Sequence, residues 1–348
     1  MVKRTTIKDV AAKAGVSYQT VSKVLNQHAR VLPETEARIW AAAKHLGYRP
    51  HLNARNLRIQ RSRTIGYSWV PAQPNQANHI LDLFLSSMVE EAEAAGYHLL
   101  PFPYRENDDQ VSGYRELIET GKVDGFVISS VNYHDPRARF LLDRGFPFVA
   151  FGRSGPELNF PYVDVDGAAG IRLATEHLIA RGHRRIGALA WPADSRVGND
   201  RLEGYLAAHR SAGLSPEPGL IARGQGTADF ARQAAAQWLA RDEARRPTAV
   251  VAFNDTMAVG AMQASLARGL AVGPDLAVVG FDDSPLAQYA SPPLTSVRQP
   301  IREVGRKCVE MLVALLEGIT LSVRHALLMP ELIVRESSLA ASGLPAAR

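Results

Sequence analysis

Apolar residues in the first 50 positions recur with the period of a helix. The first predicted helix carries apolar residues at the spacing i, i+3, i+4 and i+7, namely Ile7, Val10, Ala11 and Ala14. Thr6 and Asp9 can form a capping box at its start, and Gly15 tolerates the left-handed conformation that ends a helix. The pattern therefore predicts a short, capped helix followed by a tight turn.

Two further helices are predicted after this turn. Ser17 can cap the second helix, whose inward positions are Val21, Val24 and Leu25. The third begins near Pro33, a residue suited to a first helical turn, and ends at Gly47. Its inner face consists of Ile39, Ala42, Ala43 and Leu46. Together the three segments predict a small bundle with one apolar core.

The second helix leaves a polar face uncovered, at Tyr18, Gln19, Ser22, Lys23 and Asn26. Two short helices about a glycine turn, with polar side chains at the exposed start of the second, are typical of the helix-turn-helix that enters the DNA major groove. Glutamine and lysine can hydrogen-bond base edges there, while hydroxyl groups hold phosphates. An ordinary three-helix bundle with a polar face is the alternative interpretation.

The charge distribution favours the DNA-binding interpretation. Among the 348 residues, positions 1–63 contain thirteen Lys and Arg but three acids, a net charge of +10, whereas the remainder carries −5. A basic segment on a mildly acidic body is typical of a polyanion-binding module. The predicted DNA-binding residues of the three-helix region are Thr6, Ser17, Tyr18, Gln19, Thr20, Ser22, Lys23, Asn26 and Arg30.

A short basic segment, residues 51–58, follows the three helices and is compatible with a fourth. A lone helix of this length is marginal in water, so it should order only against a partner helix or DNA. That dependence makes the segment a predicted switch. A solvated linker is the alternative.

Beyond residue 63, strand-like runs alternate with amphipathic segments. The strand-like runs are 64–70, 98–102, 125–128, 148–151, 162–165, 186–190, 249–253 and 276–281, and the amphipathic segments include 83–95, 170–180 and 229–241. This alternation predicts two α/β lobes whose parallel sheets are covered by helices on both faces. Ligands of such folds bind at the carboxyl ends of the strands.

Polar side chains stand at or just beyond several predicted strand ends. Arg153, Asn254 and Asp282 each follow one. Such residues suit adjacent hydroxyl groups, because a carboxylate accepts from two and arginine donates in a fork. Trp191 and Phe253 can cover the apolar face of a sugar ring. The alternatives are that Asp282 caps a turn, that Arg153 pairs with an acid, and that Trp191 belongs to the core.

Segments 6–11 and 14–26 resemble the headpiece of the LacI/GalR family of transcriptional regulators, and the resemblance extends over about residues 5–337. The matching segments of the body are 64–66, 123–125, 166–170, 177–183, 201–205, 253–255, 279–283 and 293–299. The resemblance implies an N-terminal all-α helix-turn-helix headpiece and a two-lobed α/β core with parallel sheets, similar to periplasmic sugar-binding proteins.

The resemblance also implies how DNA is held. Tyr18, Gln19 and Lys23 would read bases. Asn53, Ala54 and Leu57 would belong to a hinge helix that enters the minor groove. Its Leu57 would wedge between base pairs, and its Ala54 would pack against the hinge helix of a second subunit.

In the core, the resemblance implies effector contacts at Arg201, Asn254, Asp282 and Gln299. With Arg153, Trp191 and Phe253, these form the predicted effector site.

The predicted domains are the headpiece at 1–49, a hinge helix and linker at 50–63, the core at 64–337, and a short tail at 338–348 that we expect to be disordered. By analogy with the family, one lobe of the core would comprise about 64–163 plus 295–325, and the other about 164–294.

Sequence motifs for catalysis and for metal binding are absent, including the phosphate-binding glycine loop, His-Glu-x-x-His and Gly-x-Ser-x-Gly. The single cysteine, Cys308, excludes an internal disulfide. No apolar run approaches 18 residues, and the N-terminus lacks the apolar stretch of a signal peptide. We therefore expect no catalytic residue, no cofactor, no metal, no membrane partner, and a cytoplasmic location, at the nucleoid when the protein is bound to an operator.

The sequence thus predicts a transcriptional repressor. It would bind a pseudo-palindromic operator in double-stranded DNA as a homodimer, and a small effector, a sugar or sugar derivative, would bind between the lobes of its core. A solute-binding protein without a DNA role, and a corepressor-dependent regulator or activator, are the alternatives.

Overall fold

The computed structural model describes residues 5–25, 31–48, 61–69, 79–103 and 109–339. One compact unit ends at Arg63, and a second begins at Thr64. Of the predicted DNA-binding residues, Asn26, Arg30, Asn53, Ala54 and Leu57 lie outside the described residues, as do the predicted hinge helix and residues 340–348 of the predicted tail.

The described part of the first unit contains the helices α1 (Ile7–Ala14), α2 (Tyr18–Leu25) and α3 (Pro33–His45). The predicted capping box of α1 is confirmed: the backbone N–H of Thr6 donates to Asp9 Oδ2 over 2.7 Å, and Thr6 Oγ1 accepts from the backbone N–H of Asp9 over 3.4 Å. Gly15 ends α1 with a φ of 66°, a left-handed conformation that costs glycine little.

The three helices bury one small apolar core. Val10, Val21 and Ile39, one from each helix, are fully buried at its centre. Because each helix is too short to be stable alone in water, this shared core is what holds all three in helical form.

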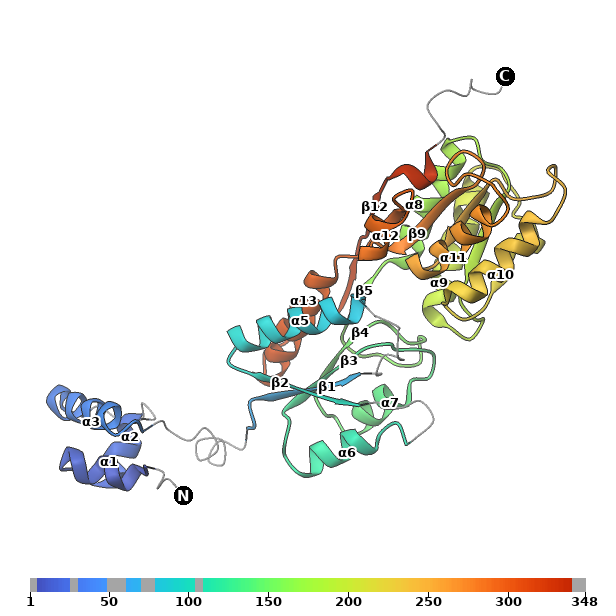
Figure 1. Cartoon of the computed structure of the whole chain (residues 1–348). Helices are drawn as coiled ribbons and strands as arrows, with labels where there is room; N and C mark the ends of the chain where they lie inside the picture. The colour runs from blue at the N-terminus through green and yellow to red at the C-terminus, as the bar shows by residue number, and fades with distance from the viewer. Residues whose placement is uncertain (1–4, 26–30, 49–60, 70–78, 104–108, 340–348) are drawn as a thin grey trace. The chain divides into compact units, whose positions relative to one another are not determined.

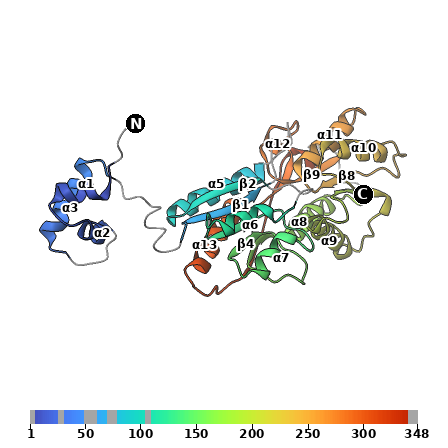
Figure 2. The same ribbon diagram turned by 90° about the horizontal axis from the view of Figure 1, so that it is seen from below.

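The second unit is built on two sheets, each covered by helices on both faces (Figures 1 and 2). The strands of the first sheet follow the spatial order β11 (His325–Leu328), β5 (Tyr162–Val165), β4 (Phe148–Phe151), β3 (Gly125–Ile128), β1 (Thr64–Trp69) and β2 (His98–Pro103). All neighbouring strands in this sheet are parallel.

Helices α5 (His79–Ala94) and α13 (Ile301–Leu316) pack on one face of the first sheet. Their apolar residues, among them Phe84 and Leu312, meet Val127 and Val149 of the strands in a fully buried cluster. The opposite face carries α6 (Ser112–Glu119) and α7 (Pro136–Asp143), with Tyr114 of α6 against Phe126 of β3.

The second sheet has the spatial order β12 (Glu331–Ile333), β10 (Thr295–Arg298), β9 (Ala277–Asp282), β8 (Ala249–Ala252), β6 (Ile186–Ala190) and β7 (Ile221–Arg223). Only β12, on the edge, runs antiparallel to its neighbour. Short 3₁₀ turns precede β7 (Pro218–Leu220) and follow β12 (Glu336–Ser338).

Helices α8 (Gly167–Ala180) and α9 (Arg196–Ser211) cover one face of this second sheet. Helices α10 (Ala228–Leu239), α11 (Asp255–Leu266) and α12 (Pro285–Tyr289) cover the other face. The predicted fold class, an all-α headpiece with a two-lobed α/β core of parallel sheets, is confirmed.

The lobe boundaries differ from the prediction at residues 295–298. Residues 295–325 were expected in the first lobe, but β10 pairs in parallel with β9, so residues 295–298 belong to the second sheet. The chain then returns to the first lobe with α13 and β11, and it enters the second sheet again with β12. The expected lobe boundaries came from analogy with the family, and local periodicity does not say which sheet offers an open edge to residues 295–298.

Candidate functional site

In the headpiece, α2 presents the side chains predicted to read bases. Tyr18, Gln19 and Lys23 are exposed, Tyr18 with 53% of its surface accessible, whereas Val21 and Val24 are buried on the opposite side of the helix. The helix therefore has one face held by the bundle and one polar face that is free to meet a partner. This is the arrangement that a recognition helix needs in order to enter a major groove.

The hydroxyl groups predicted to contact phosphates lie at helix starts. Ser17 Oγ accepts a hydrogen bond from the backbone N–H of Thr20 over 3.1 Å, which confirms the predicted cap, and it lies 2.9 Å from Thr20 Oγ1. Thr6 Oγ1 lies 2.7 Å from Asp9 Oδ2, to which it donates. Ser22 is half-buried on α2. These contacts fix the starts of α1 and α2, where backbone N–H groups attract anions.

Cations are spread over the surface of the three-helix unit. The exposed ones include Lys8, Lys13, Lys23, Arg38 and Lys44, and none of these five forms an ion pair with the part of the chain that the structure describes. Because each remains available to a phosphate, the unit has the surface expected of a module that binds a polyanion.

In the core, Arg201 on α9 occupies the centre of the predicted effector site with 4% of its surface exposed. Its guanidinium carbon lies 3.7 Å from the centre of the Phe281 ring and 4.7 Å from that of Trp191, and Nη1 donates to the carbonyl oxygen of Phe253. Burial lowers the pKa of Arg201, an effect that the nearby carboxylate of Asp282 opposes.

The position of α9 is fixed by a close approach to α8. A Cβ atom at residue 204 would lie 2.0 Å from the carbonyl oxygen of Ala168, so Gly204 permits a spacing that no side chain allows. This explains the glycine of the Arg-x-x-Gly-Tyr segment: it sets the depth at which Arg201 sits.

Asp282 stands where β9 ends, on strained backbone. Its φ is 115° and that of Asp283 is 46°, both in the region that favours glycine. Gln299 Nε2 donates to Asp282 Oδ1 over 2.7 Å. Burial raises the pKa of Asp282, although Arg201 nearby acts in the opposite direction. Two consecutive strained residues at a strand end point to a local geometry kept for function.

A buried carboxylate beneath this turn holds its shape. Asp255 Oδ2 accepts from the backbone N–H and the hydroxyl of Ser284, over 2.7 and 2.8 Å, and Oδ1 accepts from Ser296 Oγ over 2.5 Å. Asp283 is held from the other side by Arg298 and Arg335, each 2.7 Å away. The turn that carries Asp282 is therefore fixed before any ligand arrives.

Trp191 and Asn254 lie together next to Gly226. Asn254 caps α11 by accepting from the backbone N–H of Met257 over 2.7 Å, and its Nδ2 donates to the carbonyl oxygen of Gly226 over 3.1 Å. Trp191 is half-buried and packs against both apolar clusters of the second lobe. Its Nε1 is buried without a hydrogen-bond partner, and so is Nε of Arg201, within the described residues.

Four charged side chains lie where the two lobes meet. Arg153 donates to Asp164 over 2.8 Å and to Asp200 over 2.7 Å, and Arg196 donates to Asp200 over 2.9 Å and lies 3.7 Å from Asp164. Arg153 and Asp164 come from the first lobe, and the other two from α9. Arg153 thus has the acid partners of the alternative interpretation.

Phe253 departs from the prediction that its ring covers a sugar. The side chain is completely buried in the apolar cluster beneath α8 and α9, and the residue contributes its carbonyl oxygen to Arg201 instead. The ring of Phe253 therefore belongs to the core. Periodicity alone cannot distinguish a strand-end aromatic residue that is buried in the core from one that faces a ligand.

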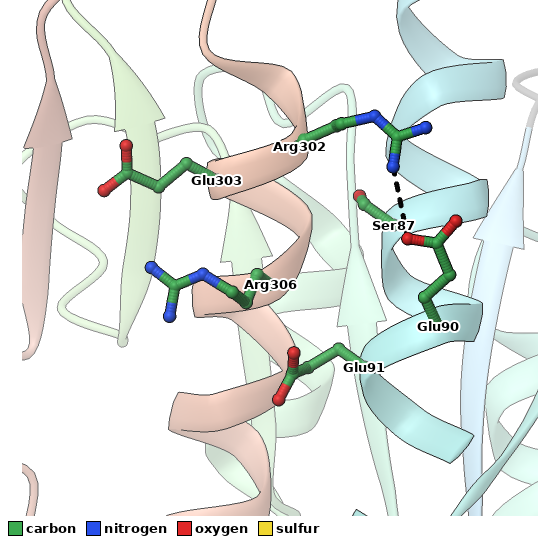
Figure 3. A pocket seen from close by; sticks show the side chains of 6 residues that line it. All are labelled: Ser87, Glu90, Glu91, Arg302, Glu303 and Arg306. Atoms are coloured by element: carbon green, nitrogen blue, oxygen red, sulfur yellow. Dashed lines mark hydrogen bonds and ion pairs between the residues drawn. The ribbon is translucent and has the colours of Figure 1, made fainter. Parts of the chain in front are cut away.

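A groove between α5 and α13 has a different character (Figure 3). Its lining consists of Ser87, Glu90, Glu91, Arg302, Glu303 and Arg306. Arg302 pairs with Glu90 over 3.1 Å, and both side chains are more than 60% exposed. Ligand sites combine apolar walls with a few polar groups, so this wholly polar, solvated groove does not fit an effector.

Comparison with known proteins bears on both units. Residues 6–51 match the family described as bacterial regulatory proteins, lacI family, and residues 175–338 match a periplasmic binding protein-like domain. The transcriptional regulator CelR of Thermobifida fusca is 35% identical over 343 residues, which span 96% of this chain and 98% of CelR. The chain belongs to the lacI family. It is a transcriptional regulator with a helix-turn-helix headpiece and an effector-binding core.

Solved structures of lacI-family members agree with this assignment. A family member from Chloroflexus aggregans is 58% identical with a TM-score of 0.77, and the match covers 80% of this chain and 99% of that one. The CelR–cellobiose complex is 34% identical with a TM-score of 0.73, over 96% and 100%. The Lac repressor dimer bound to operator and the anti-inducer ONPF is 30% identical with a TM-score of 0.84, over 97% and 100%.

Three members of the charged group between the lobes were not predicted from the sequence of this lacI-family chain. Asp164 could have been suspected, because it is a charged residue inside an apolar strand, and Arg196 and Asp200 have the i, i+4 spacing of a helical ion pair. In the described part of the chain, no helix is both long and apolar enough to cross a membrane. The same residues contain no group of three or more potential ligands that could hold a metal ion.

Proposed function

We propose that this protein is a repressor that binds a pseudo-palindromic operator as a homodimer, and that a carbohydrate bound at the strand ends of its core controls that binding. It would act in the bacterial cytoplasm, where operator DNA is accessible. The observation that carries the DNA-binding part is the free polar face of α2, with Tyr18, Gln19 and Lys23 exposed among cations that lack ion-pair partners in the described residues.

The roles within the headpiece differ. Tyr18, Gln19 and Lys23 would contact base edges, while the hydroxyls of Thr6, Ser17 and Thr20 would position the backbone. Lysine acts as a point charge rather than a fork, so Lys23 fixes its base less tightly than an arginine would. The predicted roles of Leu57 as a wedge and Ala54 as a dimer contact complete the proposal. The Lac repressor, which resembles this chain, is a dimer on its operator.

The effector part rests on the two buried donors, Trp191 Nε1 and Arg201 Nε, that have no protein partner among the described residues. Buried donors are normally satisfied, so these two favour a ligand whose oxygens complete them. Asp282 and Gln299 add an acceptor and an amide at the same place. The similarity to CelR, which was solved with cellobiose, makes a disaccharide a sensible first probe.

Control would follow from unequal binding. An effector that binds one arrangement of the two lobes more tightly shifts the protein toward it. If that arrangement disfavours pairing of the hinge helices, operator affinity falls. The coupling is reciprocal, so operator DNA must lower effector affinity by the same factor.

A direct test is fluorescence anisotropy of the full chain with a labelled fragment of its own promoter and with a random fragment of equal length. We expect the promoter fragment to bind at least a thousandfold more tightly at physiological salt. Addition of the effector should release it. Equal affinity for the two fragments, with and without candidate sugars, would contradict the proposal.

A further inference from the structure

The cations around the effector site are already neutralised by the protein itself. Arg153 and Arg196 share Asp164 and Asp200, so two positive charges meet two negative charges within 3.7 Å. All four side chains are less than a third exposed, and three of the contacts are 2.7–2.9 Å long. Arg196 Nη1 makes no hydrogen bond of its own within the described residues, but the charge of its guanidinium is already balanced by Asp200 and Asp164, so a phosphate would find a donor here without an unbalanced positive charge.

Arg201 is the remaining cation, and its surroundings do not favour an anion either. Its guanidinium lies against the rings of Phe281 and Trp191, and its Nη1 donates to the carbonyl oxygen of Phe253. The carboxylates that raise the pKa of Arg201 most are those of Asp282 and Asp164. Burial already raises the pKa of Asp282, which means that negative charge is poorly solvated at this point. A second anion beside it would be stabilised still less.

Hydroxyl groups are the partners that best match the hydrogen-bonding groups of this site. Trp191 Nε1 donates and cannot accept, and Arg201 Nε likewise donates one hydrogen bond. Asp282 accepts. A hydroxyl group both donates and accepts, so adjacent hydroxyls satisfy all three, whereas a phosphate accepts from the two donors but repels the carboxylate.

Gly226 has no side chain, and this leaves space beside the indole N–H of Trp191. A Cβ atom there would lie 3.1 Å from Trp191 Nε1 and 2.8 Å from Asn254 Nδ2. Asn254 cannot move away, since it caps α11 and binds the Gly226 carbonyl. Any side chain at 226 would therefore crowd the indole N–H.

We propose that the effector is an uncharged glycoside, that Trp191 Nε1 and Arg201 Nε each donate a hydrogen bond to one of its oxygens, and that the site rejects phosphorylated sugars. This rests on the proposed carbohydrate function and narrows it to a chemical class. Trp191 is thereby a specificity-determining residue.

Isothermal titration calorimetry of the full chain tests this with matched probes: cellobiose, sucrose and trehalose, and the 6-phosphate of each. The nucleoside cytidine serves as an uncharged ligand of another class. At least one neutral disaccharide should bind, and its phosphate should bind at least tenfold more weakly. Trp191→Phe keeps an aromatic ring, although a smaller one, and removes the donor, so it should lower affinity for that sugar by about tenfold. Gly226→Ala should lower it as well.

The matched control is Trp40→Phe, the same change at an exposed tryptophan of α3, which should leave sugar affinity within twofold. Urea unfolding of Trp191→Phe should remain one cooperative transition with a folded baseline at the concentrations of the titration, which separates a lost contact from a damaged fold.

Two results overturn the inference while leaving a carbohydrate effector in place. One is a 6-phosphate that binds as tightly as its parent sugar, and the other is an unchanged affinity in Trp191→Phe. Binding of cytidine without any sugar, or of none of the probes, would overturn the carbohydrate function and this inference together.

Discussion

In the headpiece, cations such as Lys13, Lys23 and Lys44 are exposed and form no ion pairs with the described part of the chain. In the core, Arg153 and Arg196 are held by Asp164 and Asp200, and the guanidinium of Arg201 lies against the rings of Trp191 and Phe281. Cationic side chains are thus unpaired within the described residues at these headpiece positions, whereas the charges of Arg153 and Arg196 in the core are balanced by protein carboxylates. Free charge suits a long polyanion, and internally paired charge suits a ligand that carries none.

The largest expected effect is a loss of operator affinity when the exposed face of the headpiece is changed. Replacing Tyr18 and Gln19 by Ala removes two exposed side chains on α2 and leaves Val21 and Val24 in the core. Each base contact contributes about 1–3 kcal/mol, so the double variant should bind its operator at least a hundredfold more weakly. Anisotropy measures the operator affinity, and calorimetry should show unchanged effector binding. Loss of both activities in a folded protein would argue against two separate modules.

The core is expected to be sensitive at Asp282. Asp282→Asn keeps the size and can still accept from Gln299, but it removes the charge that faces Arg201. Because hydrogen bonds to a charged acceptor are the stronger kind, effector affinity should fall roughly tenfold to a hundredfold. Operator affinity without effector should stay within twofold, as measured by anisotropy. A variant that instead loses operator affinity would place Asp282 in the coupling between modules.

A smaller effect, on the free energy of unfolding, is expected from the paired charges between the lobes. Asp200→Asn leaves Arg153 and Arg196 without one shared partner, and we expect the free energy of unfolding to drop by about 1–3 kcal/mol. The matched control is Glu310→Gln, which breaks the exposed Arg306–Glu310 pair and should cost less than about 0.5 kcal/mol. Urea denaturation of both variants provides the comparison. Equal effects would mean that the lobe contact is no more than a surface ion pair.

The smallest expected effect is a pH dependence of effector binding. The pKa of Asp282 is raised to about 7 by burial, so this carboxyl gains a proton as the pH falls through neutrality, well above the range of an ordinary aspartate. The ionised form is the better acceptor, so affinity should fall severalfold between pH 8 and pH 5.5. Asp282→Asn should lose most of this dependence, and what remains would come from Asp255, whose pKa burial raises to about 6. Titration calorimetry at the two pH values decides this, and an undiminished dependence in the variant would assign it to a group other than Asp282.

The headpiece was predictable because its signals are local. The capping pair Thr6 and Asp9 are three residues apart, and the apolar positions of each helix lie within two turns. The alternation of strands and helices likewise predicted the two α/β lobes. The strand-end rule predicted a polar site at Asp282, whereas Arg201 was expected there only from the family resemblance.

The charged group between the lobes could not be predicted from such local signals. Arg153 lies 11 residues from Asp164 and 47 from Asp200, and their contact depends on how two sheets are joined. The place of residues 295–298 in the second sheet depended on the same joining. Phe253 was assigned to a ligand because burial in the core cannot be read from its position at a strand end.

Salt dependence tests the contrast between the two regions most directly. Affinities of one preparation for its operator and for a bound neutral disaccharide should be measured at 50 and 200 mM salt. Counterion release predicts that operator affinity falls by about a hundredfold or more, while the paired charges of the core predict that sugar affinity changes by less than twofold. An operator affinity that ignores salt, or a sugar affinity that falls in parallel with it, would contradict the account.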